Sequence, residues 1–187
     1  IAPGYADDAK EYIMKKSNRR LLTIESPQHR LTPLMRERVL KPIEGGWIVQ
    51  TEEPPIIDWA SAKTVTKKQV TQSEIDSMQF AVRVCEQVKS NAIVMVQGLA
   101  TVGIGPGQTS RVEAVRIAAR RAGDRAKDCV LASDAFFPFA DGLEQAAMAG
   151  ASAIVQPGGS IRDQEVIDAA DAMGISMLFT GHRLFRH

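Results

Sequence analysis

The chain has 187 residues, of which 44% are hydrophobic, enough for one compact domain or one large half of a duplicated one. Its 23 Lys and Arg residues nearly balance 22 Asp and Glu residues, which excludes a general charge-driven preference for nucleic acid, membrane surfaces or polyanions. No apolar run approaches the roughly 20 residues of a membrane span, and the first residue, Ile1, is not Met, so we expect further residues upstream.

An α/β pattern opens the chain. Residues 7–16 predict a short helix whose inward face carries Ala9, Tyr12 and Ile13. Residues 20–24 predict a strand that follows this helix.

Prolines weaken the pattern between residues 25 and 63. One strand is predicted at residues 46–50, and the run of residues 52–55 (Glu-Glu-Pro-Pro) predicts a turn. We therefore predict two parts: an N-terminal α/β segment with a Pro-containing connection, residues 1–63, and a C-terminal domain, residues 64–187.

A capped helix and a hairpin begin the C-terminal domain. Residues 71–89 predict a helix in which Thr71 and Glu74 form a capping box. Its apolar residues repeat at helical spacing, at Ile75, Met78, Val82 and Cys85. Residues 91–96 and 99–104 then predict two strands joined by a tight Gln-Gly turn.

The run Gly103-Ile-Gly-Pro-Gly-Gln-Thr-Ser-Arg111 predicts a glycine-rich turn that ends the second strand and enters a helix. Exposed N–H groups and the helix dipole favour an anion there. The run matches neither the Walker nor the Rossmann pattern, so a plain turn is equally open. Arg111 is the sharper candidate, because a cation in the first turn of a helix opposes the dipole. Its position predicts an anionic partner, the alternative being an ordinary surface arginine.

The next helix is predicted to run to about Arg121, with Ser110 and Glu113 as a second capping box. Its outer face carries Arg116, Arg120 and Arg121, which are most simply solvated. Beyond it, strands are predicted at 129–131, 152–155 and 175–179, alternating with helices at 142–149 and 161–173. This alternation implies parallel strands with helices packed on the sheet, and functional groups at the C-terminal strand ends.

The run Ser133-Asp-Ala-Phe-Phe-Pro-Phe-Ala-Asp141 gathers three aromatic residues around a proline, in a chain that is only 5% aromatic. Such a cluster suits a flat heteroaromatic ligand, although a single Phe is more often core packing. Asp141 with Glu144 predicts a helix N-cap; alternatively, its carboxylate binds the paired N–H donors of an aminopyrimidine. Asp134 is either a turn residue or an acidic ligand for a cation.

Two further loops follow strands. The run Gln156-Pro-Gly-Gly-Ser-Ile-Arg162 exposes backbone donors near Ser160 and Ile161, with Ser160 as a predicted helix cap. The chain end, residues 180–187, holds Arg183 where ligands bind in such sheets, the alternative being an exposed tail arginine.

Several catalytic signatures are absent from the sequence. It has no His-x-Glu with Pro-Cys-x-x-Cys, which excludes an intact zinc deaminase, and neither a Gly-x-Ser-x-Gly elbow nor a Cys/His pairing. Cys85 and Cys129 have no partners at metal-ligand or redox spacing. We predict no metal site from these residues and interpret both cysteines as buried thiols of a cytosolic protein.

Five motifs in the same order resemble the C-terminal part of AICAR transformylase, a family that usually shares one polypeptide with IMP cyclohydrolase. They are Lys89-Ser-Asn-Ala-Ile-Val94, Gly103 to Arg111, Ser133 to Phe139, Gln156 to Asp163 and Phe185-Arg-His187. The resemblance is continuous from Thr64 to His187 and weaker, though visible, from Ile1.

The resemblance implies a three-layer αβα fold of the cytidine-deaminase-like kind, this chain being mostly the second of two such subdomains. It implies formyl transfer from 10-formyltetrahydrofolate to AICAR in purine synthesis, by a cytoplasmic homodimer, and allows a monovalent cation near the chain end. Carried over by motif, the AICAR contacts are Asn91, Arg111, Phe136 and Arg183, and the folate contacts are Val112, Asp141, Ser160 and Ile161.

Formyl transfer needs a base, donors for the tetrahedral oxyanion and an acid for the folate nitrogen. The resembled family supplies these from a Lys-His pair, which this sequence lacks, so we expect the chain alone to be inactive. Two residues depart from the motifs: Ala140, where relatives usually have a basic residue that favours the folate tail, and Pro106, where Ala is usual. The competing interpretations are a non-catalytic binding module and a structural dimerisation domain.

Overall fold

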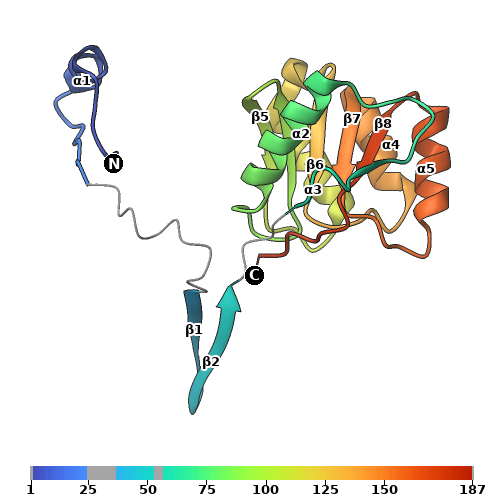
Figure 1. The fold of residues 1–187 in the computed structure, drawn as a ribbon, viewed down its shortest axis with the longest axis horizontal. Helices are drawn as coiled ribbons and strands as arrows, with labels where there is room; N and C mark the ends of the chain where they lie inside the picture. Colours follow the sequence, from blue (N-terminus) through green and yellow to red (C-terminus); the bar gives the residue numbers. More distant parts are fainter. Residues whose placement is uncertain (1, 25–36, 53–56, 187) are drawn as a thin grey trace. The chain divides into compact units, whose positions relative to one another are not determined.

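A computed structural model describes residues 2–24, 37–52 and 57–186. The chain divides into two compact units, residues 1–54 and 55–187, which are considered separately (Figure 1). The boundary predicted after residue 63 stays a prediction.

The first unit begins with helix α1 (Asp7–Met14), which confirms the predicted N-terminal helix. The predicted inward face is wrong, because α1 buries no residue and Tyr12 is 69% exposed. An apolar helix face is buried only where another element covers it. The strand predicted at residues 20–24 is also wrong, since this segment makes a single β-bridge, between Ala2 and Thr23.

An antiparallel hairpin of β1 (Glu37–Ile43) and β2 (Gly46–Glu52) completes the described part of this unit. Strand β2 confirms the prediction at residues 46–50. Strand β1 was not predicted, because Pro42 interrupts its apolar pattern; both strands of a hairpin are edges, where a proline is tolerated. Of the turn predicted at residues 52–55, Glu52 ends β2 and the rest lies outside the described residues.

A six-stranded mixed sheet forms the centre of the second unit, in the order β3-β8-β7-β6-β4-β5. The strands are β3 (Lys63–Thr64), β4 (Ile93–Gln97), β5 (Ala100–Gly105), β6 (Cys129–Ser133), β7 (Ala151–Gln156) and β8 (Ser176–Phe179). Strands β6, β7 and β8 are parallel, as their alternation with helices predicts. Strand β4 is antiparallel to both β5 and β6, which confirms the predicted hairpin and places it at one edge.

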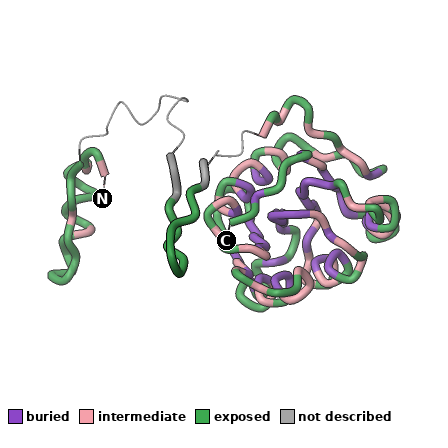
Figure 2. Tube along the Cα trace, turned by 90° about the horizontal axis from the view of Figure 1, so that it is seen from below, coloured by how far each residue is buried: buried purple, intermediate pink, exposed green. Residues whose placement is uncertain are grey.

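Helices cover both faces of this sheet, which confirms a three-layer αβα arrangement (Figure 1). Helix α2 (Gln72–Cys85) packs on one face; α3 (Arg111–Ala122), α4 (Ala140–Ala149) and α5 (Asp163–Ala172) pack on the other. Figure 2 shows buried residues filling the interior of this unit, whereas the described residues of the first unit are intermediate or exposed. None of the described helices is long and apolar enough to cross a membrane.

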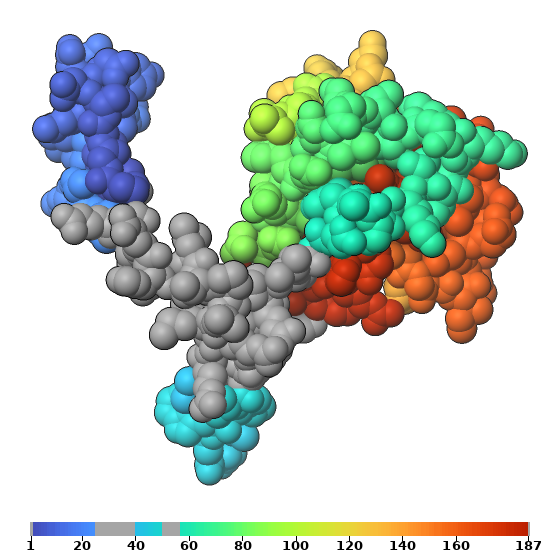
Figure 3. Space-filling view, in the orientation of Figure 1, coloured from blue at the N-terminus to red at the C-terminus, as the bar shows by residue number. Residues whose placement is uncertain are grey.

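The segment before α2 pairs with β8 through β3, and Figure 3 shows this teal segment beside the red C-terminal part of the chain. Val65 donates its N–H to the carbonyl oxygen of Met177 at 3.0 Å, and Met177 donates to the hydroxyl of Thr66 at 2.8 Å. Helix α2 then starts at the predicted capping box, in which the Thr71 hydroxyl accepts from the N–H of Glu74 and the Glu74 carboxylate accepts from that of Thr71.

Gly103 and Gly105 both belong to β5, which ends one residue later than the predicted strand, so the turn begins after Gly105. A Cβ atom at Gly103 would overlap the carbonyl oxygen of Ala118, and one at Gly105 would overlap that of Ala114. These glycines therefore let α3 approach the strand more closely than any side chain would allow. Of the three glycines in this run, only Gly107, with a φ of 64°, has the left-handed backbone conformation typical of a glycine turn.

Two arginines cover the outer edge of β5. Arg121 of α3 donates from Nη1 to the carbonyl oxygen of Ile104 at 2.8 Å. Arg125, in the 3₁₀ turn η2 (Gly123–Ala126), donates from Nη2 to the carbonyl oxygen of Val102 at 3.3 Å. Arg121 is thus bonded to the sheet as well as exposed, whereas Arg116 and Arg120 lie on the exposed helix face as predicted.

Candidate functional site

The loops singled out in the sequence meet at one end of the sheet, where backbone hydrogen bonds hold them together. Asn91, just before β4, donates its N–H to the carbonyl oxygen of Gln108 at 3.0 Å, which joins it to the loop after β5. Leu184, near the chain end, donates to the carbonyl oxygen of Asp134 at 2.8 Å, just after β6. Segments distant in sequence thus build one site.

Arg111 is the centre of this site. Its Nε donates to the hydroxyl of Ser133 at 2.9 Å, and its Nη1 donates to the carbonyl oxygen of Phe136 at 3.1 Å. Its Nη2 donates to Asn91 Oδ1 at 2.9 Å and to Asp134 Oδ1 at 2.7 Å. The Arg111 side chain is only 9% exposed, so the alternative of an ordinary surface arginine is wrong.

Asp134 is the anionic partner that the position of Arg111 predicts, and it belongs to the chain itself. Its side chain is fully buried, and its second oxygen, Oδ2, has no hydrogen-bond partner among the described residues. Arg111 donates four of its five N–H groups to protein acceptors. Among the described residues, the remaining N–H on Nη1 has no acceptor.

Phe136, whose carbonyl oxygen accepts from Arg111, also contacts Arg183 through its ring. The Arg183 guanidinium is 5.1 Å from the centre of the Phe136 ring, within the range of a cation–π contact. Arg183 is exposed and Phe136 is partly buried. The residues expected to contact AICAR are therefore linked in one chain of contacts: Asn91 to Arg111, Arg111 to Phe136, and Phe136 to Arg183.

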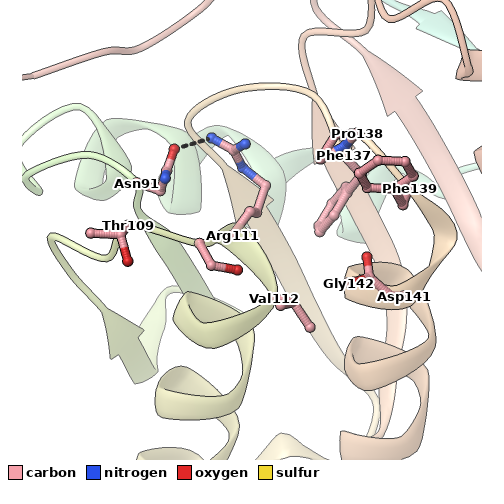
Figure 4. Close-up of a pocket in the computed structure, with 10 residues that line it drawn as sticks. Asn91, Thr109, Arg111, Val112, Phe137, Pro138, Phe139, Asp141 and Gly142 are labelled. Atoms are coloured by element: carbon pink, nitrogen blue, oxygen red, sulfur yellow. Dashed lines mark hydrogen bonds between the residues drawn. The ribbon is translucent and has the colours of Figure 1, made fainter.

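An open hollow of about 330 Å³ adjoins this group (Figure 4). Asn91 and Arg111 lie on one side of it, and the aromatic loop and Asp141 lie on the other. The lining residues are Asn91, Thr109, Ser110, Arg111, Val112, Phe137, Pro138, Phe139, Asp141 and Gly142. This volume is near the lower limit for a small-molecule pocket.

Two of the expected folate residues, Val112 and Asp141, line this hollow. The predicted N-cap role of Asp141 is wrong: α4 begins at Ala140, with Phe139 at the N-cap and no side-chain cap. Asp141 therefore lies within the first turn, where Oδ1 accepts the N–H of Gly142 at 2.7 Å. The exposed carboxylate keeps acceptor capacity for a ligand.

The other two, Ser160 and Ile161, do not line the hollow. Ser160 is not the helix cap that we predicted, because α5 begins at Asp163. The Asp163 carboxylate accepts the N–H groups of Gly159, at 2.7 Å, and Ser160, at 3.1 Å. The backbone donor expected at Ser160 is thus satisfied within the loop, while the Ile161 side chain is fully exposed.

Arg162 connects this loop to the hollow. Its guanidinium lies 4.7 Å from the centre of the Phe139 ring, and Phe139 lines the hollow. We had not singled out Arg162, because nothing in its local pattern distinguishes it from a surface arginine.

Gln156 is a second residue that sequence reasoning missed. It is 1% exposed at the end of β7, and its Oε1 accepts the N–H of Phe137 at 2.8 Å. It therefore fixes the aromatic loop to the neighbouring strand. The sequence did contain one indication of this role, because Gln156 is an amide at the end of an otherwise apolar strand.

Both cysteines are buried, as predicted. Burial raises the pKa of Cys129 to about 11, and burial together with the charge of Asp134 raises the pKa of Cys85 still further. These folded pKa values exceed those of the unfolded chain, so the uncharged buried thiols contribute to the stability of the folded protein below about pH 8.5. This contribution is lost as the pH rises toward 11, because the unfolded chain then ionises its thiols first.

We therefore expect both thiols to resist iodoacetamide at pH 8 and to react rapidly once urea unfolds the protein. Mass spectrometry of the alkylated protein measures this. Fast labelling of the folded protein at either site would contradict the burial described.

Comparison with known proteins agrees with the motifs in the sequence. A family model described as AICARFT/IMPCHase bienzyme matches residues 1–121. The bifunctional purine biosynthesis protein PurH of Acetivibrio thermocellus is 46% identical over 187 residues, and that of Chelativorans sp. is 49% identical over 196. Both alignments cover 100% of this chain and 36% of the relative, so the chain spans about a third of these proteins' length.

Among solved structures, Acinetobacter baumannii RibD, form 2, is similar at 14% identity with a TM-score of 0.40, covering 57% of this chain and 34% of that one. A similarity of this size carries no argument about fold or function.

Proposed function

The chain belongs to the AICARFT/IMPCHase bienzyme family, and from this premise we propose that it forms the C-terminal part of the transformylase site. The reaction is formyl transfer from 10-formyltetrahydrofolate to AICAR in purine biosynthesis. The enzyme acts as a cytoplasmic homodimer, and the full-length protein also carries IMP cyclohydrolase activity.

One observation carries this proposal: the four residues expected to contact AICAR form a connected group beside a hollow that two expected folate residues line. This group places three kinds of ligand-binding side chain in one site. Arg183, Phe136 and Asn91 supply an exposed cation, an aromatic face and an amide. A phosphorylated heteroaromatic carboxamide has matching features.

Each side chain then has a definite task. Asn91 Nδ2 donates one N–H to the carbonyl oxygen of Gln108 at 2.9 Å, which leaves its second N–H to orient the carboxamide of AICAR. Arg111 offers its remaining N–H, Phe136 stacks on the imidazole, and Arg183 binds phosphate.

The folate site lies across the same hollow. Asp141 accepts the paired N–H donors of the pterin, because a carboxylate matches two parallel donors. Val112 contacts the folate from α3, and Ser160 with Ile161 contacts it from the loop before α5. Helix α3 thus contributes to both substrates, because Arg111 and Val112 are adjacent in its first turn.

The proton-transfer groups come from outside this chain. The amine of AICAR is a poor nucleophile, so transfer needs a base and an oxyanion donor, and no Lys-His pair is present in this sequence. We infer that the preceding subdomain supplies them and that residues 64–187 are a cytidine-deaminase-like subdomain. The three-layer architecture supports this assignment.

A monovalent cation fits one place beside the site. The buried Oδ2 of Asp134 has no partner among the described residues, and the Leu184 N–H ties the chain end to the Asp134 backbone. Because Arg111 already pairs with the other carboxylate oxygen, a single positive charge suits this position better than a divalent ion. When bound, it would supply electrostatic support for the buried carboxylate.

The test is transfer of an isotope-labelled formyl group by the full-length protein. We expect Asn91→Ala combined with Phe136→Ala to lower the rate by about 100-fold or more, because substrate positioning and stacking are both lost. Arg120→Ala, on the exposed face of α3, is the matched control and should leave the rate unchanged. A double variant with the wild-type rate would refute the proposal.

The competing function is a self-sufficient, non-catalytic binding module, which the presence of a hollow within this chain alone favours. Calorimetry on residues 1–187 separates the two. Weak or absent binding of AICAR and folate indicates a site completed by the preceding subdomain, whereas tight binding indicates a separate module.

A further inference from the structure

We propose that Arg162 binds the glutamyl carboxylates of the folate and so sets the preference for the charged tail of this substrate. This inference rests on the proposed function and adds a specificity-determining residue to it. Arg162 lies outside the residues that the family motifs assign to substrate contacts.

The first support is the position of Arg162 at the rim of the hollow. Its guanidinium is 4.7 Å from the centre of the Phe139 ring, and Phe139 lines the hollow together with Asp141. The same ring thus contacts a guanidinium before α5 and lines the hollow with the exposed carboxylate of Asp141 in α4. Phe139 is 48% exposed, so part of its ring remains available to a ligand.

The second support is that the positive charge of Arg162 remains available. Its nearest acidic partner, Glu165, is 3.5 Å away, and both side chains are about half exposed, at 53% and 50%. An exposed pair of this kind is weak. The adjacent carboxylate, Asp163, is already engaged with the N–H groups of Gly159 and Ser160.

The third support is the match to folate chemistry. A folate carries a pterin with paired donors at one end, an aminobenzoyl ring in the middle and glutamyl carboxylates at the other end. Asp141, Phe139 and Arg162 supply an acceptor, an aromatic face and a planar cation. A guanidinium binds a carboxylate with two parallel hydrogen bonds. Ala140, beside Phe139, has no charge for this task.

The experiment compares 10-formyltetrahydrofolate with an analogue whose glutamate is replaced by an uncharged methylamide, using the full-length protein. We expect Arg162→Gln to raise the KM for the folate about tenfold, as for loss of one charge-assisted contact, and to leave kcat and the KM for AICAR within twofold. With the methylamide the variant and the wild type should have equal KM values. The difference on folate should shrink as salt is raised.

Two variants complete the test. Arg162→Lys keeps the charge but loses the planar fork, so it should recover part of the folate affinity; Arg120→Gln, which removes a distant exposed charge, should have no effect. An unchanged folate KM in Arg162→Gln, or an equal rise with the methylamide, would overturn the inference while wild-type formyl transfer still stands. A wild-type protein without formyl transfer would overturn the proposed function and this inference together.

Discussion

Replacing Arg111 by Met is expected to lower the free energy of unfolding by about 3–5 kcal/mol, since it leaves the carboxylate of Asp134 buried without its cation. The same change should lower formyl transfer by more than about 100-fold, because Asn91 and the Phe136 loop lose the guanidinium that fixes them. Urea unfolding and labelled formyl transfer by the full-length protein measure the two effects.

A second substitution separates stability from activity. Adding Asp134→Leu to Arg111→Met removes both charges, and a buried ion pair replaced by apolar side chains is often close to neutral in stability. We expect most of the lost stability to return while activity stays low. If activity returned as well, Arg111 would have only a structural role. Arg120→Met, on the exposed face of α3, is the control and should change stability by less than about 0.5 kcal/mol.

Replacing Gly105 by Ala is expected to destabilise the second unit by about 3 kcal/mol, the upper part of the usual range for overpacking. The added Cβ would overlap the carbonyl oxygen of Ala114, a backbone atom of α3 that no side-chain rotation can move aside. Relief therefore requires the helix to shift away from β5, and Arg111 lies in the first turn of that helix.

Urea unfolding measures this loss, with Ala100→Ser as the matched control. Ala100 lies on the same strand, is exposed, and likewise gains one heavy atom. It should change stability by less than about 0.5 kcal/mol. Equal stability of Gly105→Ala and the wild type would show that α3 and β5 are not packed backbone to backbone.

The predictions from sequence succeeded where the responsible interactions are local. The Thr71 and Glu74 capping box spans four residues, and both of its hydrogen bonds are present. At Ser110 and Glu113 the same pattern was confirmed only in part: Ser110 is the N-cap of α3, but its side chain makes no cap hydrogen bond. Glu113 instead lies 3.5 Å from Arg116, one turn further along α3. The residues of a capping box can thus be recognised in a sequence, but they do not establish that its hydrogen bonds form.

The core of the candidate site could be predicted only in part, because its contacts join distant segments. The position of Arg111 in a helix's first turn indicated an anionic partner, yet Asp134 is 23 residues away in the sequence. The contact of Arg162 with Phe139 likewise depends on two loops that only the sheet brings together. The family motifs indicated which residues contact the substrates, and the structure showed how these residues contact one another.

The arginines at the edge of β5 also determine where this sheet ends. Backbone carbonyl groups along an exposed strand are acceptors for any further strand, from another copy of the chain or from an unfolded one. Here Arg121 and Arg125 occupy the acceptors of Ile104 and Val102 and place two positive charges in the path of an incoming strand. Among the described residues, these two side chains thus hinder growth of the sheet into aggregates at this edge.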